Sequence, residues 1–217
     1  MGCRRVVIVA GGETDLSDLK QIQAEDTVIG VDGGILPLLE NSVPFHRAVG
    51  DFDTVATEVV QRLLERGIPV EELPAAKDMT DTRYAVERGL EEDPEEILIL
   101  GGLGGPRMDH AFANLLLLER IEACGVHGVI RNQYNRIRLL TGERGALVMT
   151  GGEFRYVSLL ALTDRVEGVT LEGFLYPLTH ACLTRENPVG ISNELTGKTA
   201  HVRIREGQLL VMESRDR

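Results

Sequence analysis

The segment ILILGGLGGPRMDH, residues 97–110, joins the most apolar short run of the chain to a helical pattern through a glycine-rich turn. The run Ile97–Leu100 predicts a strand. Beyond the turn, apolar residues at 112, 115, 116, 118 and 121 have the spacing of one helix face. A strand, a glycine turn and a helix in this order are typical of a unit in a parallel α/β sheet.

The same alternation fills the first 140 residues. Further strands are predicted at Val6–Ala10, Val28–Val31, Arg47–Gly50, Pro69–Leu73 and Val126–Ile130. Helices are predicted at Thr14–Ala24, Ile35–Asn41, Thr57–Arg66, Thr80–Glu91 and His110–Cys124. Repeated alternation of this kind favours a mostly parallel, Rossmann-like α/β/α sheet, which binds ligands beyond the carboxyl ends of its strands.

The pattern changes near Leu140, after which short β-like runs follow one another without a convincing helix. Glu206-Gly207, between two such runs, is interpreted as a hairpin-like turn. The runs are Arg136–Leu140, Ala146–Met149, Phe154–Leu162, Arg165–Leu171, Thr199–Arg205 and Gln208–Met212. We therefore expect an α/β domain over residues 1–135 and a small all-β sandwich domain over residues 140–217, with the boundary in Asn132–Gly145.

Composition limits the classes of function. The chain has 217 residues, 43% of them hydrophobic and 26% charged, as in a globular protein. With 23 basic and 34 acidic side chains the net charge is −11, which argues against nucleic-acid or anionic-membrane partners. The first apolar run reads as a strand, not as a secretory signal or membrane span. Cys3, Cys124 and Cys182 are too widely spaced for a zinc site or disulfide framework, which favours a reducing cytoplasm.

Two carboxylates follow the strand at Arg47–Gly50, in Gly50-Asp51-Phe52-Asp53-Thr54. In extended chain the side chains of Asp51 and Asp53 point to the same side. Two hard oxygen ligands so placed suit Mg²⁺ held together with phosphates. The alternative is that both residues merely form a turn or cap the next helix.

A second acidic motif, Lys77-Asp78-Met79-Thr80-Asp81, precedes the helix predicted from residue 80. As structure, it predicts that Asp78 caps the helix and that Asp81 is the capping-box acid. The same helix start offers free N–H groups to a phosphate. Lys77 adds an ammonium that could contact the phosphate.

The glycine-rich turn itself is a third candidate. Gly101, Gly102, Gly104 and Gly105 allow a close approach of backbone to ligand. Arg107 can fork onto a phosphate, Asp109 is placed to cap the helix, and His110 could bond to ligand or backbone. The turn is not a P-loop, because no GK[ST] closes it.

Two shorter glycine turns, Ala10-Gly11-Gly12 and Val31-Asp32-Gly33-Gly34, end the first two predicted strands. Each alone is an ordinary tight turn. A doubly wound sheet would bring all these elements to one edge. Its glycine-lined rim would carry Asp32, Asp51, Asp53, Asp78, Asp81 and Asp109. Such crowded like charges repel, and a bound Mg²⁺ accounts for them better than a structural role does.

Taken together, these motifs resemble those of thiamine pyrophosphokinases. Their order and their span, nearly the whole chain, match the family, as do Asn114 after the glycine turn and Gly190-Ile191-Ser192-Asn193-Glu194 in the β half. The resemblance implies an α/β nucleotide-binding catalytic domain followed by a thiamine-binding β-sandwich. It also implies the reaction: Mg²⁺-dependent transfer of the diphosphoryl group of ATP to the hydroxyl of thiamine, giving thiamine diphosphate and AMP.

The resemblance assigns roles residue by residue. Asp51, Asp53, Asp78 and Asp81 would hold Mg²⁺ or orient the hydroxyl, and Lys77 and Arg107 would steady phosphate oxygens. Pro106 stands where the family usually has a second glycine before the arginine, which removes one N–H from the turn. The nucleotide would lie on Gly11, Gly12, Gly33, Gly34, Gly102, Gly104 and Gly105, with Asp32, Asp109, His110 and Asn114 completing the rim.

In the family, thiamine lies between the subunits of a homodimer, so the resemblance implies a homodimer here. Tyr176 matches a position where the family often has an aromatic residue, commonly Trp. This chain has no Trp, so stacking on thiamine falls to Tyr176 or Phe174. Ser192 and Asn193 would supply polar contacts to thiamine.

Two other functions fit parts of the sequence. Asp51-Phe52-Asp53-Thr54 also resembles the DxDxT motif of haloacid-dehalogenase-like phosphatases, in which Asp51 would be the nucleophile. In those enzymes the motif usually follows the first strand, whereas here it follows the third. The second alternative is a non-catalytic module that binds a nucleotide or thiamine.

Overall fold

The computed structural model describes residues 4–53, 55–74 and 78–216. The chain divides into two compact units, Met1–Gln133 and Tyr134–Arg217, and each is described by itself. The first unit combines helices with a parallel sheet and the second is built of antiparallel strands, which confirms the predicted α/β fold class.

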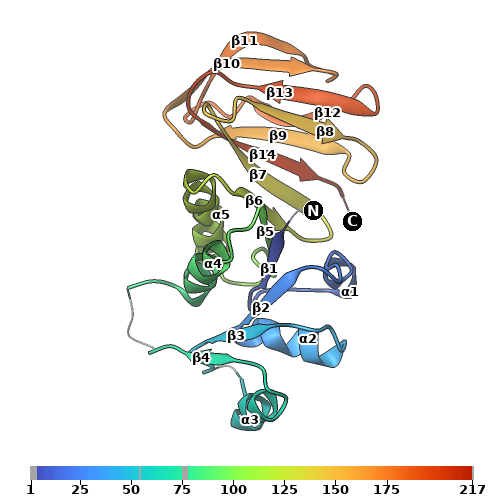
Figure 1. Cartoon of the computed structure of the whole chain (residues 1–217). Coiled ribbons are helices and arrows are strands. Elements are labelled where there is room, and N and C mark those ends of the chain that lie inside the picture. Colours follow the sequence, from blue (N-terminus) through green and yellow to red (C-terminus); the bar gives the residue numbers. More distant parts are fainter. Residues whose placement is uncertain (1–3, 54, 75–77, 217) are drawn as a thin grey trace. The chain divides into compact units, whose positions relative to one another are not determined.

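The first unit alternates strands and helices along nearly its whole length (Figure 1). In chain order its elements are β1 (Arg5–Val9), α1 (Leu16–Leu19), β2 (Thr27–Val31), the 3-10 turn η1 (Asp32–Gly34), α2 (Ile35–Glu40), β3 (Arg47–Gly50), α3 (Thr57–Glu65), β4 (Val70–Glu72), α4 (Asp81–Glu91), β5 (Glu96–Leu100), α5 (Met108–Ala123) and β6 (His127–Arg131).

The strands of this unit form a parallel sheet in the order β6-β5-β1-β2-β3-β4. The chain runs outward from β1 to β4 and then returns, so that β5 pairs with the other side of β1. The direction of winding therefore reverses between β1 and β5. In open parallel sheets, ligands bind in the crevice outside the carboxyl ends of the strands at such a switch point.

Both faces of the sheet are covered. On one face, Val7 and Val9 of β1 share a buried cluster with Leu19, Leu38 and Leu63 of α1, α2 and α3. On the opposite face lie α4 and α5 (Figure 1). Gly89 lets α4 approach closely, because a Cβ there would lie only 3.1 Å from the side chain of Val6. Successive strand residues thus pack against helices on opposite faces of the sheet. Strands buried on both faces are expected to be apolar along nearly their whole length, as these are.

The helix starts differ from the sequence predictions in three places. The predicted helix at 14–24 is only α1, whose capping box is formed by Asp15 and Asp18. The N-cap of α4 is Thr80, whose side chain accepts from the N–H of Arg83, so the capping role predicted for Asp78 is wrong. Asp109 lies inside the first turn of α5 and does not cap it.

The second unit is a sandwich of antiparallel sheets. Its strands are β7 (Asn135–Thr141), β8 (Ala146–Thr150), β9 (Tyr156–Ala161), β10 (Arg165–Glu172), β11 (Leu178–Thr184), β12 (Gly190–Glu194), β13 (Thr199–Arg203) and β14 (Gln208–Ser214). One sheet has the order β12-β9-β14-β7 and the other β11-β10-β13-β8. Residues from both sheets, such as Leu159 and Val211 from one and Val169 and Val202 from the other, share a single buried core.

Two predictions for this unit need correction. Strands β11 and β12 were not predicted. Glu206-Gly207 is not a hairpin turn, because β13 and β14 belong to different sheets. The turn carries the chain across the sandwich, and Gly207 adopts a φ of 95° there.

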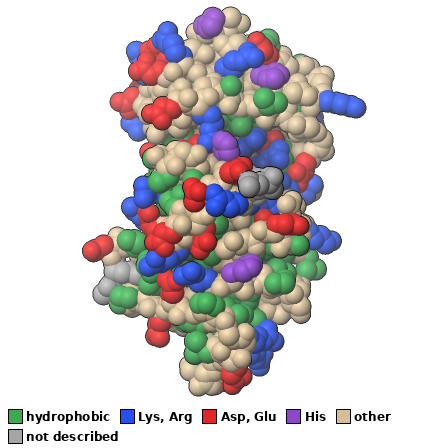
Figure 2. All heavy atoms as spheres, viewed as in Figure 1, with side chains coloured by type: hydrophobic (Ala, Val, Ile, Leu, Met, Phe, Trp, Pro, Cys, Tyr) green, Lys and Arg blue, Asp and Glu red, His purple; other side chains and the backbone are tan. Residues whose placement is uncertain are grey.

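Charged and large hydrophobic side chains both reach the surface. On the face that Figure 2 shows, acidic and basic side chains are interspersed. Among residues 4–53, 55–74 and 78–216, no helix has the length and apolar character needed to cross a bilayer.

Candidate functional site

The site forms where the loops after β1 and β5 meet at the switch point. The N–H of Gly12 donates to the carbonyl oxygen of Gly101 at 3.0 Å, and the N–H of Ala10 donates to that of Leu100 at 2.8 Å. A Cβ on Gly12 would lie 2.4 Å from the Gly101 oxygen. Gly101, at φ 64°, leaves equally little room, since its Cβ would lie 2.3 Å from the Ala10 oxygen. Both loops need glycine because their backbones are in contact.

Asp32 ties the end of β2 to the end of β3. Its Oδ1 accepts the N–H of Phe52 at 3.3 Å. The same carboxylate lies directly over Gly50, where a Cβ would come within 1.8 Å of Oδ1. Asp32 itself has a φ of 45°, which an Asp tolerates better than most residues. The loops after β2 and β3 are therefore locked together at the rim.

The loop after β3 carries Asp51 and Asp53, but not in extended chain. Phe52 between them has a φ of 54°, and its side chain is buried in the core of the first unit. The chain therefore turns sharply at this point, and the N–H of Asp53 donates to Oδ1 of Asp51 at 3.2 Å. The geometric reason given for placing the two carboxylates together was wrong. Both nevertheless line one cleft, because the turn folds the loop over the sheet edge.

This cleft has a volume of about 460 Å³ and gathers most of the predicted nucleotide and metal residues. It is lined by Gly11, Gly12, Asp32, Gly33, Asp51, Asp53, Asp81, Gly102, Gly104, Gly105, Arg107, His110 and Asn114. It is also lined by Thr82 and Ala111, which lie outside the motifs selected from the sequence. Their signal was their position, since each adjoins a selected residue at the start of a helix or the end of a strand.

Four predicted residues do not line the cleft or cannot be placed. Gly34 is buried beneath it, where a Cβ would lie 2.1 Å from the carbonyl oxygen of Val9. Asp78 is exposed and lies outside the lining. Asp109 also lies outside the lining. Lys77 lies outside the described residues.

Asp109 holds the side chain of Arg107, which lines the cleft. Arg107 Nε donates to Asp109 Oδ1 at 2.9 Å and Nη2 donates to Oδ2 at 2.5 Å. Hydrogen bonds from Arg107 lower the pKa of the Asp109 carboxyl to about 2. Both side chains are largely exposed, so the pair orients the guanidinium more than it stabilises the fold.

Asn114 supports the glycine turn from below. It is buried, and its Nδ2 donates to the carbonyl oxygen of Gly102 at 3.0 Å. Asn114 lies in the second turn of α5, so its hydrogen bond holds the glycine-rich loop against this helix. A side-chain amide replaces the backbone partner that an irregular turn lacks.

The carboxylates of the cleft suit Mg²⁺ by their chemistry, since Mg²⁺ prefers oxygen ligands. Within the described part of the chain, no three His, Cys, Asp or Glu side chains converge closely enough to enclose a metal ion. Mg²⁺ at nucleotide sites is commonly held by one or two carboxylates together with phosphate oxygens and water. The arrangement of Asp32, Asp51, Asp53 and Asp81 around one cleft fits that kind of site.

The residues assigned to thiamine lie in the second unit. Tyr176 is 66% exposed, whereas Phe174 is buried. The buried Asn193 bonds the backbone of Tyr176 twice: Oδ1 accepts its N–H at 3.0 Å, and Nδ2 donates to its carbonyl oxygen at 2.8 Å. Ser192 is exposed, and its N–H donates to Ser158 Oγ at 3.0 Å. Asn193 thus holds the segment that presents the Tyr176 ring.

Comparison with known proteins agrees with this architecture. Residues 19–128 match the model of the thiamin pyrophosphokinase catalytic domain. Residues 147–209 match that of the thiamin pyrophosphokinase vitamin B1 binding domain. The chain belongs to the thiamin pyrophosphokinase family. The resemblance found in the sequence motifs is thereby confirmed.

Relatives in the thiamin pyrophosphokinase family match over nearly full length. Thiamine pyrophosphokinase of Bacillus subtilis (strain 168) is 34% identical over 98% of this chain and 100% of its own. The crystal structure of the B. subtilis enzyme has a TM-score of 0.90 at 29% identity, covering 99% of this chain and 100% of that one. That from Geobacillus thermodenitrificans has a TM-score of 0.86 at 30% identity, covering 98% of both. At 15% identity, the Candida albicans enzyme shows only the shared fold, with a TM-score of 0.80 over 98% of this chain and 90% of its own.

Proposed function

We propose that this chain is a thiamine diphosphokinase that transfers the diphosphoryl group of ATP to the hydroxyl of thiamine, with Mg²⁺, and releases AMP. The observation that carries the proposal is the glycine-lined cleft at the switch point, whose rim holds Asp32, Asp51, Asp53 and Asp81. Membership of the thiamin pyrophosphokinase family supports the identity of the two substrates.

The glycine loops are suited to bind the nucleotide. Gly11, Gly12 and Gly33 leave backbone atoms open to the cleft, and the start of α5 points N–H groups toward it. Arg107 would bind phosphate oxygens with the planar fork that Asp109 already orients. Lys77 keeps its proposed role as a phosphate contact.

Asp51, Asp53 and Asp81 would hold Mg²⁺ together with the triphosphate. When bound, Mg²⁺ neutralises charge that develops on the phosphate oxygens. The chain's own task is alignment: the rim must keep the thiamine hydroxyl in line with the β-phosphorus while AMP leaves. Asp78 lies outside the cleft lining, and we keep it in the proposal as a further carboxylate of this group.

Thiamine would stack on the ring of Tyr176, since an exposed aromatic face attracts a flat, cationic thiazolium. Ser192 would contribute a polar contact to thiamine, and Asn193 would act mainly by holding Tyr176 in place. Exposed apolar side chains of the second unit, namely Leu175 next to Tyr176 and Val189 and Ile191 at the start of β12, support burial of this part of the unit in a homodimer. We infer that thiamine lies at that subunit interface.

The exposed thiols of Cys124 and Cys182 form no disulfide among the described residues, which supports a reducing, cytoplasmic location.

A direct test of the dimer is the mass of the protein in solution by light scattering. A monomer at micromolar concentration that is fully active would contradict the shared site.

The reaction itself is tested by incubating the full chain with ATP, thiamine and Mg²⁺ and separating the products. The proposal predicts AMP and thiamine diphosphate in equal amounts. Phosphate release from a simple phosphoester without ATP would instead indicate phosphatase chemistry at Asp51. Tight binding of both substrates without product would indicate a binding module.

A further inference from the structure

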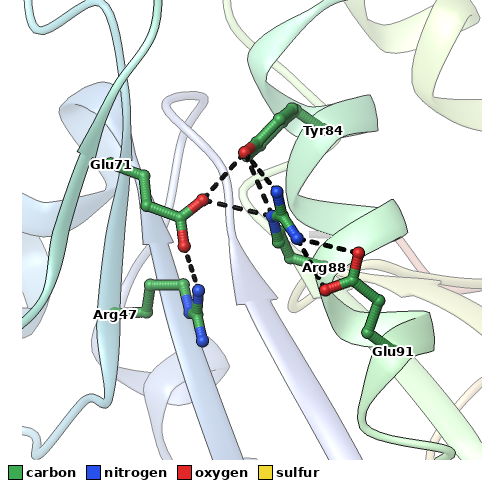
Figure 3. Close-up of polar contacts among 5 residues, drawn as sticks. All are labelled: Arg47, Glu71, Tyr84, Arg88 and Glu91. Carbon is green, nitrogen blue, oxygen red and sulfur yellow. Dashed lines mark hydrogen bonds and ion pairs between the residues drawn. The ribbon is translucent and has the colours of Figure 1, made fainter.

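A polar network around Glu71 joins the edge strand β4 to β3 and α4 (Figure 3). One oxygen of Glu71 accepts from the guanidinium of Arg47 on β3. The other accepts from the Tyr84 hydroxyl of α4 at 2.9 Å, and Arg88 Nε of α4 lies 3.2 Å from it. A single carboxylate therefore connects three elements of the first unit.

The helix side of the network is itself held in place. Arg88 Nε and Nη2 donate to the Tyr84 hydroxyl at 3.0 and 2.8 Å. Arg88 Nη1 donates to both oxygens of Glu91, at 2.8 and 2.6 Å. The guanidinium also lies 5.0 Å from the centre of the Tyr84 ring. Glu71 therefore meets pre-oriented donors, which reduces the entropy cost of its hydrogen bonds.

Two of these elements lead directly into the cleft. β3 ends at Gly50, immediately before Asp51, and Glu71 pairs with Val49 just before that end. α4 begins at Asp81, three residues before Tyr84, and both Asp81 and its N-cap Thr80 line the cleft. Glu71 thus connects the two elements that present Asp51 and Asp81.

The burial of the network sets it apart from the surface ion pairs. The side chains of Glu71, Arg47 and Arg88 are 24%, 32% and 34% exposed, whereas the pair Arg4–Asp93 is 65% and 88% exposed. Burial raises the pKa of the Glu71 carboxyl, but the hydrogen bonds from Tyr84 and Arg47 and the charges of Arg47 and Arg88 outweigh it, so the pKa lies below its ordinary value.

We propose that Glu71 is a positioning residue that fixes the start of α4 against β3, and so sets the spacing between Asp81 and the Asp51–Asp53 loop around a shared Mg²⁺–triphosphate. This role rests on the proposed function. Glu71 can affect the reaction without touching a substrate, because a displacement of about 1 Å in a positioned group can cost roughly 10²-fold in rate.

The test compares Glu71→Gln with Glu87→Gln as a matched control. Glu87 lies on the same helix, its side chain is 28% exposed, and it pairs with Arg120 of α5 at 2.8 Å. It therefore loses a comparable ion pair that does not reach β3 or β4. The measurements are the melting temperature, calorimetric binding of a non-hydrolysable ATP analogue with and without Mg²⁺, kcat, and KM for thiamine.

For Glu71→Gln we expect the Kd of the analogue in Mg²⁺ to rise about 3–10-fold and kcat to fall about tenfold, with binding in the absence of Mg²⁺ and KM for thiamine unchanged within about twofold. Glu87→Gln leaves the two dissociation constants of the analogue, kcat and KM for thiamine within about twofold of the wild-type values. Tyr84→Phe removes one donor to Glu71, so it should also raise the Kd of the analogue in Mg²⁺ and lower kcat. If Glu71→Gln does not fold, Tyr84→Phe tests the proposal in its place.

The proposal is overturned if a folded Glu71→Gln binds the Mg²⁺ complex as the wild type does, or if Glu87→Gln weakens it equally. A wild type that forms no AMP would refute the proposed function instead. In that case the binding measurements still decide whether Glu71 positions the two carboxylate loops.

Discussion

The N–H of Gly12 donates to the carbonyl oxygen of Gly101 at 3.0 Å, which joins the loops after β1 and β5 across the switch point of the sheet. The two residues are 89 positions apart in sequence but share one backbone contact. Because no side chain separates the loops, their backbones lie against each other and together line one side of the cleft, which is called its floor below. The floor depends on glycine at both positions.

We predict that Gly12→Ala destabilises the fold and weakens ATP binding. Its Cβ would lie 2.4 Å from the Gly101 oxygen, and forcing such an atom into packed structure costs about 1–3 kcal/mol. Gly197→Ala is the control, because a Cβ there meets nothing within 4 Å. Thermal melting and ATP titration of both variants check this. Equal melting temperatures for the two would contradict the close approach of the loops.

Asp53→Asn should leave the fold intact and remove Mg²⁺-dependent turnover. Asp53 is exposed at the cleft, so the change costs little stability, but under the proposed function it removes a charge that a bound Mg²⁺–triphosphate would need. We expect kcat to fall about 10²-fold or more. Asp93→Asn, at another exposed aspartate paired with Arg4, should keep wild-type activity. A folded Asp53→Asn with wild-type rates would remove this residue from the metal assignment.

Arg107→Ala should raise KM for ATP about tenfold and leave KM for thiamine unchanged, because Arg107 lines the cleft in which we propose that ATP binds. Arg83→Ala removes a half-exposed arginine of α4 that does not line the cleft, and it serves as the comparison. Steady-state kinetics with each substrate varied in turn give KM for ATP and KM for thiamine of both variants. A parallel rise in both KM values for Arg107→Ala would argue against a specific phosphate contact.

Tyr176→Ala should raise KM for thiamine about tenfold without changing KM for ATP, since stacking on a cation contributes about 1 kcal/mol or more. Asn193→Ala should have the same effect on thiamine, because it releases the backbone of Tyr176. Val148→Ala, at an exposed residue of β8, is the control for loss of apolar surface. If Asn193→Ala alone impairs thiamine binding, the ring is not the contact.

The carboxyl of Glu71 makes the stability of the chain depend on pH. Its folded pKa lies below the ordinary value near 4.5, so its contribution is present above that pH and is lost as pH falls through the folded pKa. Arg47, Tyr84 and Arg88 are the groups that face it. Glu71→Gln should therefore melt a few degrees lower than the wild type at pH 7, by roughly 2–4 °C for each 1 kcal/mol lost. The gap should close in acid, and a gap independent of pH would contradict the ionic network.

Much of the fold could be predicted from sequence, because buried parallel strands are short apolar runs between glycine turns and helices. Ile97–Leu100 and Arg47–Gly50 are examples that the structure reproduces within a residue. Strands β11 and β12 escaped prediction because they are irregular. His180 and Ser192 have φ values of 48° and 57°, and register shifts interrupt the pairing, so the two-residue alternation is lost.

The members of the cleft followed from topology, since loops after parallel strands meet at one edge. Their individual geometry did not follow. The sharp turn at Phe52 depends on burying its ring in the core, and the cap of α4 falls on Thr80 where Asp78 was predicted. The Glu71 network also had no local signal, because its partners come from three separate elements.

The most direct test of the central claim is product analysis after the full chain is incubated with thiamine, ATP and Mg²⁺. Transfer of an intact diphosphoryl group predicts AMP and thiamine diphosphate in a one-to-one ratio, with neither product formed when Mg²⁺ is chelated. ADP with thiamine monophosphate, or no transfer to thiamine at all, would contradict it.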